Sequence, residues 1–205
     1  MTHATASAVF DESPRPAGQK LSPVSLKEDP VSRASRQFRR WERRTRERAW
    51  QDARRFALDL YWKGPRPQSY EVGVVLEEGE QLHRAVWVSY STLGRTPDYL
   101  DGQGRLRHGS PYWRDWGWCQ TLLTSHRLAS RLANDGDRLI SNCWPAILGV
   151  EVDLEADAVV LEDGVGEWRG LYRGPATAII AVAAIEHLYG TTALSEYPGL
   201  QSIRL

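Results

Sequence analysis

The side chains that could carry chemistry in this chain are few, and none has a spacing typical of a catalytic site. Three carboxylates, Glu151, Asp153 and Glu155, alternate along one predicted strand. They therefore share a face and could in principle act as a general acid–base group. The same alternation is more typical of a solvated strand face. We predict that these carboxylates face solvent and take no part in catalysis.

Two cysteines and a histidine are the next candidates. Cys119, His126 and Cys143 offer the ligands that zinc prefers, but their spacing matches no zinc-site pattern. Nothing in the sequence places a base beside either thiol, as a nucleophilic cysteine would require. Gly102 and Gly104 lack the strand–loop–helix context of a phosphate-binding loop. We therefore expect no metal, no cofactor and no enzyme; an unrecognised hydrolase or metalloenzyme is only the third hypothesis.

The strongest functional signal is a basic segment. Residues Arg33–Arg55 contain ten arginines and three acidic residues, a net charge of +7 in a chain whose total is zero. Such a segment can attach to nucleic acid, acidic lipid or an acidic protein surface. Two alternatives stay open: the arginines form an ordinary solvated helix face, or they neutralise the seven acids spread over Glu151–Glu167. We favour docking with the arginine face outward, because burying an unpaired arginine is costly.

Residues Gly94–Asp115 form a second candidate feature. They are rich in Gly and Pro, which predicts a long loop, and loops of this length in a compact domain are usually functional or disordered. We combine the two features into one set of candidate binding residues. These are Arg36, Arg39, Arg40, Arg43, Arg44, Trp50, Arg54 and Arg55 in the basic segment, and Arg105, Arg107 and Trp113 in the loop.

The elements that would position these residues follow from periodicity. The basic segment predicts one helix from Arg33 to about Trp62, because its apolar residues recur at three- and four-residue steps. That stripe is Phe38, Trp41, Thr45, Ala49, Ala53, Phe56 and Leu60. Trp50 lies off the stripe, among the arginines. Gly64–Pro67 is expected to end the helix.

A series of short strands follows the helix, and tight turns join most of them, so neighbouring strands should pair antiparallel. The predicted strands are Tyr70–Leu76, Leu82–Leu93, Thr121–Thr124, Leu128–Ala133, Arg138–Ile140, Leu148–Leu154, Val159–Leu161 and Trp168–Arg173. Strict alternation predicts that Leu148, Val150, Val152 and Leu154 face the core. A nearly all-apolar helix, Ala176–Leu188, should then pack on the sheet and end at Gly190.

This order of elements resembles the pleckstrin-homology-like family, specifically its bacterial PH/GRAM-type members. The resemblance covers roughly Glu71–Gly190. It rests on Gly79–Glu80 at the start of the sheet, the T-x-x-R-L phrase in Leu123–Leu128, the Ile147–Leu154 strand and the terminal helix. It implies an α+β fold: an antiparallel meander, or partly open barrel, with one C-terminal helix and a long basic amphipathic helix before it. In this family the loop between the first two strands often forms the binding rim.

The predicted organisation is a disordered tail (1–32), the basic helix (33–63), the PH-like domain (70–190) and a C-terminal tail (191–205). No signal peptide or apolar run of bilayer length is evident, so we expect a cytoplasmic protein. The leading hypothesis is a non-enzymatic binding or adaptor module that engages a protein or an anionic polymer or surface. The alternative is a nucleic-acid-associated protein that uses the Arg33–Arg55 helix.

Overall fold

The computed structural model describes residues 30–64, 67, 74–132, 135–136, 138–164 and 168–203, with side chains from Arg40 onward. The chain divides into two compact units, residues 1–38 and 39–205. All contacts reported below lie within the second unit. The predicted disordered tail falls almost entirely outside the described residues, as does Leu205.

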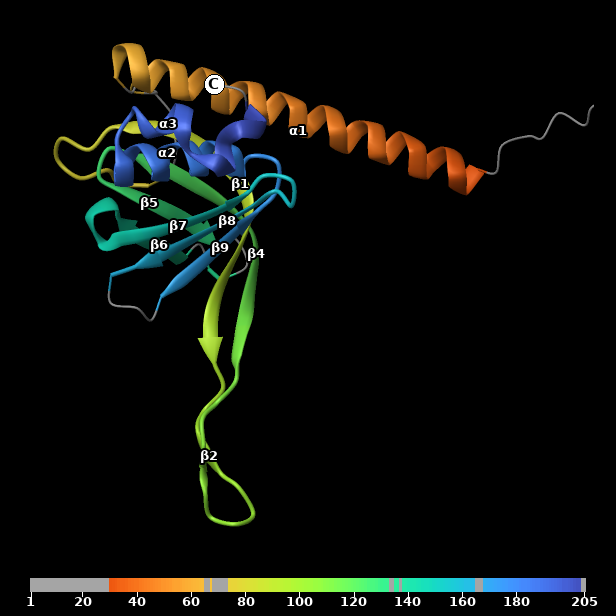
Figure 1. The fold of residues 1–205 in the computed structure, drawn as a ribbon, viewed down its shortest axis with the longest axis vertical. Coiled ribbons are helices and arrows are strands. Elements are labelled where there is room, and N and C mark those ends of the chain that lie inside the picture. Colours follow the sequence, from red (N-terminus) through yellow and green to blue (C-terminus); the bar gives the residue numbers. More distant parts are fainter. Residues whose placement is uncertain are drawn as a thin grey trace, which may run out of the picture. The chain divides into compact units, whose positions relative to one another are not determined.

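One seven-stranded antiparallel sheet forms the body of the second unit (Figure 1). Its strand order is β6-β5-β4-β1-β9-β8-β7, so β1 joins two groups of three neighbouring strands. The strands are β1 (Leu82–Arg95), β4 (Pro111–Thr124), β5 (Arg127–Leu132), β6 (Arg138–Cys143), β7 (Ile147–Asp153), β8 (Ala158–Asp163) and β9 (Arg169–Arg173). The sheet is not closed into a barrel. The predicted α+β class, with a helix on each side of the strands in sequence, is confirmed.

Helix α2 (Thr177–Tyr189) is the apolar helix that the sequence predicts. Every residue from Thr177 to Ile185 is buried, so only its last turn meets solvent. Gly190 ends it with φ +81°, a conformation that residues with a Cβ adopt only at a cost. The helix begins two residues later than its Gly174–Pro175 signal suggests. A short tail, α3 (Ala193–Glu196) and η2 (Pro198–Ile203), then covers β7, where Tyr197 donates to the carbonyl of Val150.

Helix α1 (Pro30–Lys63) carries the basic segment. Ala53, Phe56 and Leu60 are buried in the same core cluster as the strands and α2. The predicted apolar stripe therefore docks, as expected, over its C-terminal half. Trp41, which the sequence also places on this stripe, is 61% exposed. Burial of Ala53, Phe56 and Leu60 anchors the helix, because removing apolar surface from water stabilises the folded state.

The alternation of buried and exposed side chains in β1 confirms the prediction of which residues face the core. Val86, Val88 and Tyr90 are buried, whereas Trp87 is 58% exposed. Tyr90 packs against Tyr172 of β9, with ring centroids 4.9 Å apart. β1 pairs with β4 on one side and with β9 on the other, and both tyrosines are fully buried there.

Two expectations about the strands need correction. Leu148 is exposed, because a register irregularity between Ile147 and Gly149 interrupts the alternation and buries Ile147 instead. Val150 and Leu154 are buried as predicted, and Val152 is half-buried. Of the predicted strand Tyr70–Leu76, residues 74–76 are not in a strand and the rest lies outside the described residues.

The predicted loop Gly94–Asp115 is wrong, and the correction matters for function. β1 and β4 continue outward past the body and pair as far as Arg95 and Pro111. Two further short strands, β2 (Tyr99–Leu100) and β3 (Leu106–Arg107), extend the same hairpin to its tip. Figure 1 shows this hairpin leaving the sheet as a two-stranded projection, which we call the arm (residues 91–115).

Candidate binding surfaces

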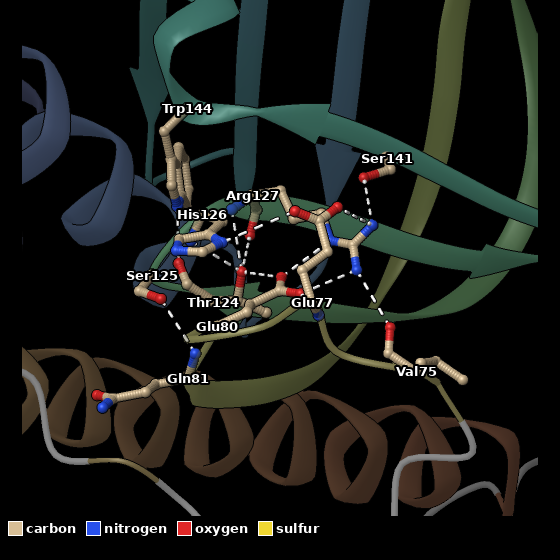
Figure 2. Close-up of polar contacts among 10 residues, drawn as sticks. All are labelled: Val75, Glu77, Glu80, Gln81, Thr124, Ser125, His126, Arg127, Ser141 and Trp144. Carbon is tan, nitrogen blue, oxygen red and sulfur yellow. Dashed lines mark hydrogen bonds and ion pairs between the residues drawn. The ribbon is translucent and has the colours of Figure 1, made fainter.

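A buried polar cluster fastens the segment before β1 to the β4–β5 turn (Figure 2). At its centre the Glu80 carboxylate accepts hydrogen bonds from Arg127 Nε at 2.8 Å and Nη2 at 2.9 Å. It also accepts from Thr124 Oγ1 at 2.6 Å and from the backbone N–H of Glu77 at 2.7 Å. The carboxylate has no exposed surface. Four donors therefore saturate it, and no position is left for a substrate.

The electrostatics of this cluster agree with a structural role. Burial alone would raise the pKa of Glu80, but the hydrogen bonds from Arg127 and Thr124 outweigh it and lower that pKa to about 2. The same carboxylate raises the pKa of Arg127. Arg127 also donates to Ser141 and to the carbonyl of Val75, so it ties three segments together. The Glu80–Arg127 pair holds the fold and is not a catalytic dyad.

The thiols are far from any arrangement for catalysis. Cys119 is fully buried in β4, where burial raises the pKa of its thiol and Thr121 lies 3.5 Å from its sulfur. Cys143 is exposed and unpaired. His126 lies at the β4–β5 turn, 3.8 Å from a Glu77 carboxylate oxygen. Within the described residues no group of three His, Cys, Asp or Glu side chains could hold a metal ion.

The acidic strand face is partly neutralised by nearby arginines. Arg169 of β9 donates to Glu151 at 2.7 Å and also pairs with Glu162. Arg46 of α1 donates twice to Asp157, at 2.9 and 2.6 Å. Among the described residues, Arg46–Asp157 is the one ion pair that joins α1 to an acid of residues 151–163. The basic helix thus neutralises the acidic face at Asp157, and its exposed arginines do not take part in this described ion pair.

Most α1 arginines face solvent. The exposed ones in the described part of the helix are Arg40, Arg43, Arg44, Arg48, Arg54 and Arg55. Asp52 contacts Arg55 at 3.4 Å, a weak surface pair. Trp50 is half-buried and packs against the core, so its expected position on the free arginine face is wrong. The side chains of Arg36 and Arg39 lie outside the described residues.

The arm is a well-formed hairpin with a defined tip. Tyr99 pairs with Arg107 and Leu100 with Leu106 across the tip. Asp101 closes the turn, since its carboxylate accepts from the backbone N–H groups of Gln103 and Arg105 and from Arg107 Nε. These bonds lower the pKa of Asp101. Arg107 is therefore engaged within the arm, whereas Arg105 is exposed.

Large apolar side chains on the arm lack cover. Those exposed are Tyr99, Leu100, Leu106, Tyr112 and Trp113. Leu100 is 68% exposed and Trp113 is 40% exposed. The register pairs Leu93 with Trp113 and Ser89 with Trp118, and alternation along β1 puts Leu93 and Ser89 on the same face as Trp87. Trp113 and Trp118 are five residues apart on β4, and a register irregularity between Tyr90 and Ser91 lets them share that face. An aromatic surface thus runs from the sheet onto the arm; we call Trp87, Trp118 and Trp113 the tryptophan face.

Sequence reasoning selected Trp113, Arg105 and Arg107 but missed Trp87 and Trp118 as members of one face. The available signal was the alternation of Trp87 with Val86 and Val88, which places Trp87 outward. The structure places Arg105 and Arg107 near the tip of the arm and Trp113 on β4, paired with Leu93. The α1 arginines belong to a different element.

Comparison with known proteins adds no assignment: no protein-family model matches the chain, and no curated protein matches it. Among the helices of the described residues, none has both the length and the apolar character needed to cross a bilayer.

Proposed function

We propose that this protein is a non-enzymatic binding or adaptor module that engages a protein partner through the arm and the tryptophan face. The single observation behind the proposal is the exposure of aromatic and leucine side chains along one projecting hairpin. Contiguous exposed apolar surface in a folded protein usually marks an interface. Tyr, Trp and Arg are also the residues that contribute most binding energy at protein interfaces.

The local construction of the arm supports this proposal. Its strands belong to the central part of the sheet, and the backbone pairs down to the tip, so the arm is ordered before binding. An ordered surface loses less conformational entropy on association than a flexible loop. Arg114 stacks on Trp116, 3.9 Å from the ring centroid, which holds one of the arm's arginines against the body. These features favour a preformed docking element.

The strand order and the helix that follows β9 support the proposed likeness to PH-like domains. In that likeness the hairpin between the first two core strands corresponds to the binding rim. The two free cysteines fit a reducing compartment, and we propose the cytoplasm as the location of the protein.

A second function, attachment to nucleic acid, is favoured by a separate observation. Six arginines of α1 face solvent along an element that is anchored to the core. A phosphate polymer could bind this face through counterion release, with affinity that falls steeply as salt rises.

One experiment separates these functions and uses an arm-shortened variant. In this variant, residues 97–109 are replaced by Asn-Gly, so that the pairing of β1 with β4 is retained and a two-residue turn closes the hairpin. The full chain and the shortened chain are used to capture partners from extracts of the native cell, with and without nuclease. A protein captured by the full chain only, and insensitive to nuclease, is the expected result.

Capture of the same proteins by both chains would overturn the role of the arm. Recovery of nucleic acid that nuclease abolishes would favour the second function. Its matched test replaces Arg43, Arg44, Arg54 and Arg55 by Gln in the full chain. Removing α1 instead would disrupt the core, because Phe56 and Leu60 belong to it.

A further inference from the structure

A cavity lies where α1, α2 and the β4–β5 turn meet. Its volume is about 150 Å³, and it opens to solvent on one side. Phe56 and Leu60 of α1, Leu123 of β4, Trp144 of η1 (Trp144–Ala146) and Ala183 of α2 line its interior, and all five are buried. A cavity of this size in an apolar setting can take a single small organic group.

The mouth of the cavity carries one carboxylate. Glu186 of α2 lines it together with His187 and Ser125, which are exposed. No lysine or arginine is among the described residues that line the cavity. Burial raises the pKa of Glu186, and no hydrogen bond or ion pair with a side chain in the described part of the chain offsets that cost. This contrasts with Glu80, whose four donors leave it no capacity for a ligand.

Two histidines also line the cavity: His83, which is buried, and His187, which is exposed at the mouth. His187 lies against Trp144, with ring centroids 5.4 Å apart, and burial lowers the pKa of its imidazole. The indole N–H of Trp144 already donates to the carbonyl of Thr124 at 2.7 Å, visible at the edge of the cluster in Figure 2. The hydroxyl of Ser125 accepts from the backbone of Gln81, and its own proton is free to donate. Glu186 is the acidic side chain among the described residues that line the cavity, and its carboxylate would attract a cation.

We propose that this cavity is a binding site for a primary ammonium group carried on a short apolar stem. The stem would fill the space between Phe56, Leu123 and Ala183, and the ammonium would donate a hydrogen bond to Glu186. Two sources share this chemistry: a free alkylamine, and the lysine side chain of a protein. The site is separate from the arm, so it does not depend on the proposed adaptor function.

The test is ligand-observed NMR with the full chain and three four-carbon probes: n-butylammonium, 1-butanol and butyrate. We expect saturable binding of n-butylammonium with a Kd on the order of 1 mM, since so small a ligand offers few contacts. We expect the alcohol to bind about tenfold more weakly and butyrate not at all, because only the ammonium makes a charge-assisted bond. A short peptide with one central lysine distinguishes the sources: tighter binding of the peptide than of n-butylammonium indicates a protein lysine, and equal binding indicates a free amine.

Two variants and a control keep the test decisive. Glu186→Gln should weaken n-butylammonium binding about tenfold, whereas Glu196→Gln, the same change at an exposed position on α3, should not. Ala183→Leu should fill the cavity and abolish binding of all probes. Far-UV circular dichroism and a thermal melt establish that each variant is folded. No saturable binding of n-butylammonium, equal binding of the amine and the alcohol, or retention of amine affinity in Glu186→Gln would each overturn the proposal.

Discussion

Glu80→Gln preserves the shape of the side chain but removes the charge that accepts hydrogen bonds from Arg127 and Thr124. The pKa of Glu80 is about 2 in the folded chain, against an ordinary value of 4.5. Each pKa unit corresponds to about 1.4 kcal/mol, so ionisation of this one group stabilises the folded state by about 3 kcal/mol. That magnitude agrees with the roughly 3–5 kcal/mol expected when one partner of a buried ion pair is removed.

The sign of the pH dependence follows from the lowered pKa. The stabilisation from Glu80 is fully present above about pH 4.5, where the carboxylate is charged in both the folded and the unfolded chain. It is lost progressively as the pH falls from about 4.5 towards 2, because the unfolded chain takes up the proton first. The difference in unfolding free energy between the parent and Glu80→Gln should therefore be large at pH 7 and small near pH 2.5.

The assay is urea unfolding at a series of pH values between 7 and 2.5, followed by tryptophan fluorescence. Glu78→Gln is the matched control, since Glu78 is exposed and two residues away; it should change the unfolding free energy by less than about 0.5 kcal/mol. If Glu80→Gln destabilised the protein equally at pH 7 and pH 3, the charge would not be the source of the stability. A loss below about 1 kcal/mol at pH 7 would refute the assignment of a buried, saturated ion pair.

Three further predictions address other parts of the molecule. Thiol titration with an aromatic disulfide should detect one reactive cysteine in the native protein, Cys143, and two after denaturation, because Cys119 is buried; rapid reaction of both in the native state would contradict the core. A double-mutant cycle with Arg46→Ala and Asp157→Asn should give a coupling of about 1 kcal/mol that decreases with salt; zero coupling would mean that the pair does not anchor α1. Leu100→Ser should leave the melting temperature within about 2 °C, since the side chain is exposed, but should abolish capture of an arm-dependent partner; a large fall in melting temperature would show that the arm tip supports the fold.

Much of the fold could be predicted because its signals are local. The alternation of Val86, Trp87 and Val88 indicates a strand with one wet face, and the apolar run from Thr177 to Ile185 indicates a covered helix. Gly190 marks the end of that helix by a requirement on a single residue. The docking of Phe56 likewise follows from helical spacing alone. In each case the buried residues carry their own periodicity.

The arm escaped prediction because it has no buried face to impose such a period. Beyond Thr92, the last β1 residue that pairs with β9, its strands pair only with each other, so exposed residues such as Tyr112 and Leu100 occur where a loop would also allow them. Gly94 suggests a loop, yet it is paired with Tyr112 in the hairpin. The Tyr112 ring lies over it, 3.2 Å from the position that a Cβ would occupy. A glycine needed for close approach cannot be told from one needed for flexibility by composition.

The Glu80–Arg127 pair and the cavity could not be predicted from the sequence, for a different reason. Glu80 and Arg127 are 47 residues apart, and Phe56 and Glu186 are farther apart still. Contacts at such separations depend on the topology of the sheet, and no local pattern encodes them. The exposure of Leu148 belongs to the same class, because a register irregularity depends on the partner strand.

The continuity of β1 and β4 has a mechanical consequence. Each strand has 14 residues, about 48 Å of extended chain, and continues from the arm into the core, where Val88 and Cys119 are fully buried. One register irregularity, between Tyr90 and Ser91, lies at the base of the arm. A load applied along the arm therefore acts parallel to the strands and must shear the pairs that β1 makes with β9 and that β4 makes with β5. Hydrogen bonds that share a load along the strands break together, whereas a flexible loop would extend before any of them broke. Tension on a bound partner would thus act on the strand pairs that join β1 to β9 and β4 to β5.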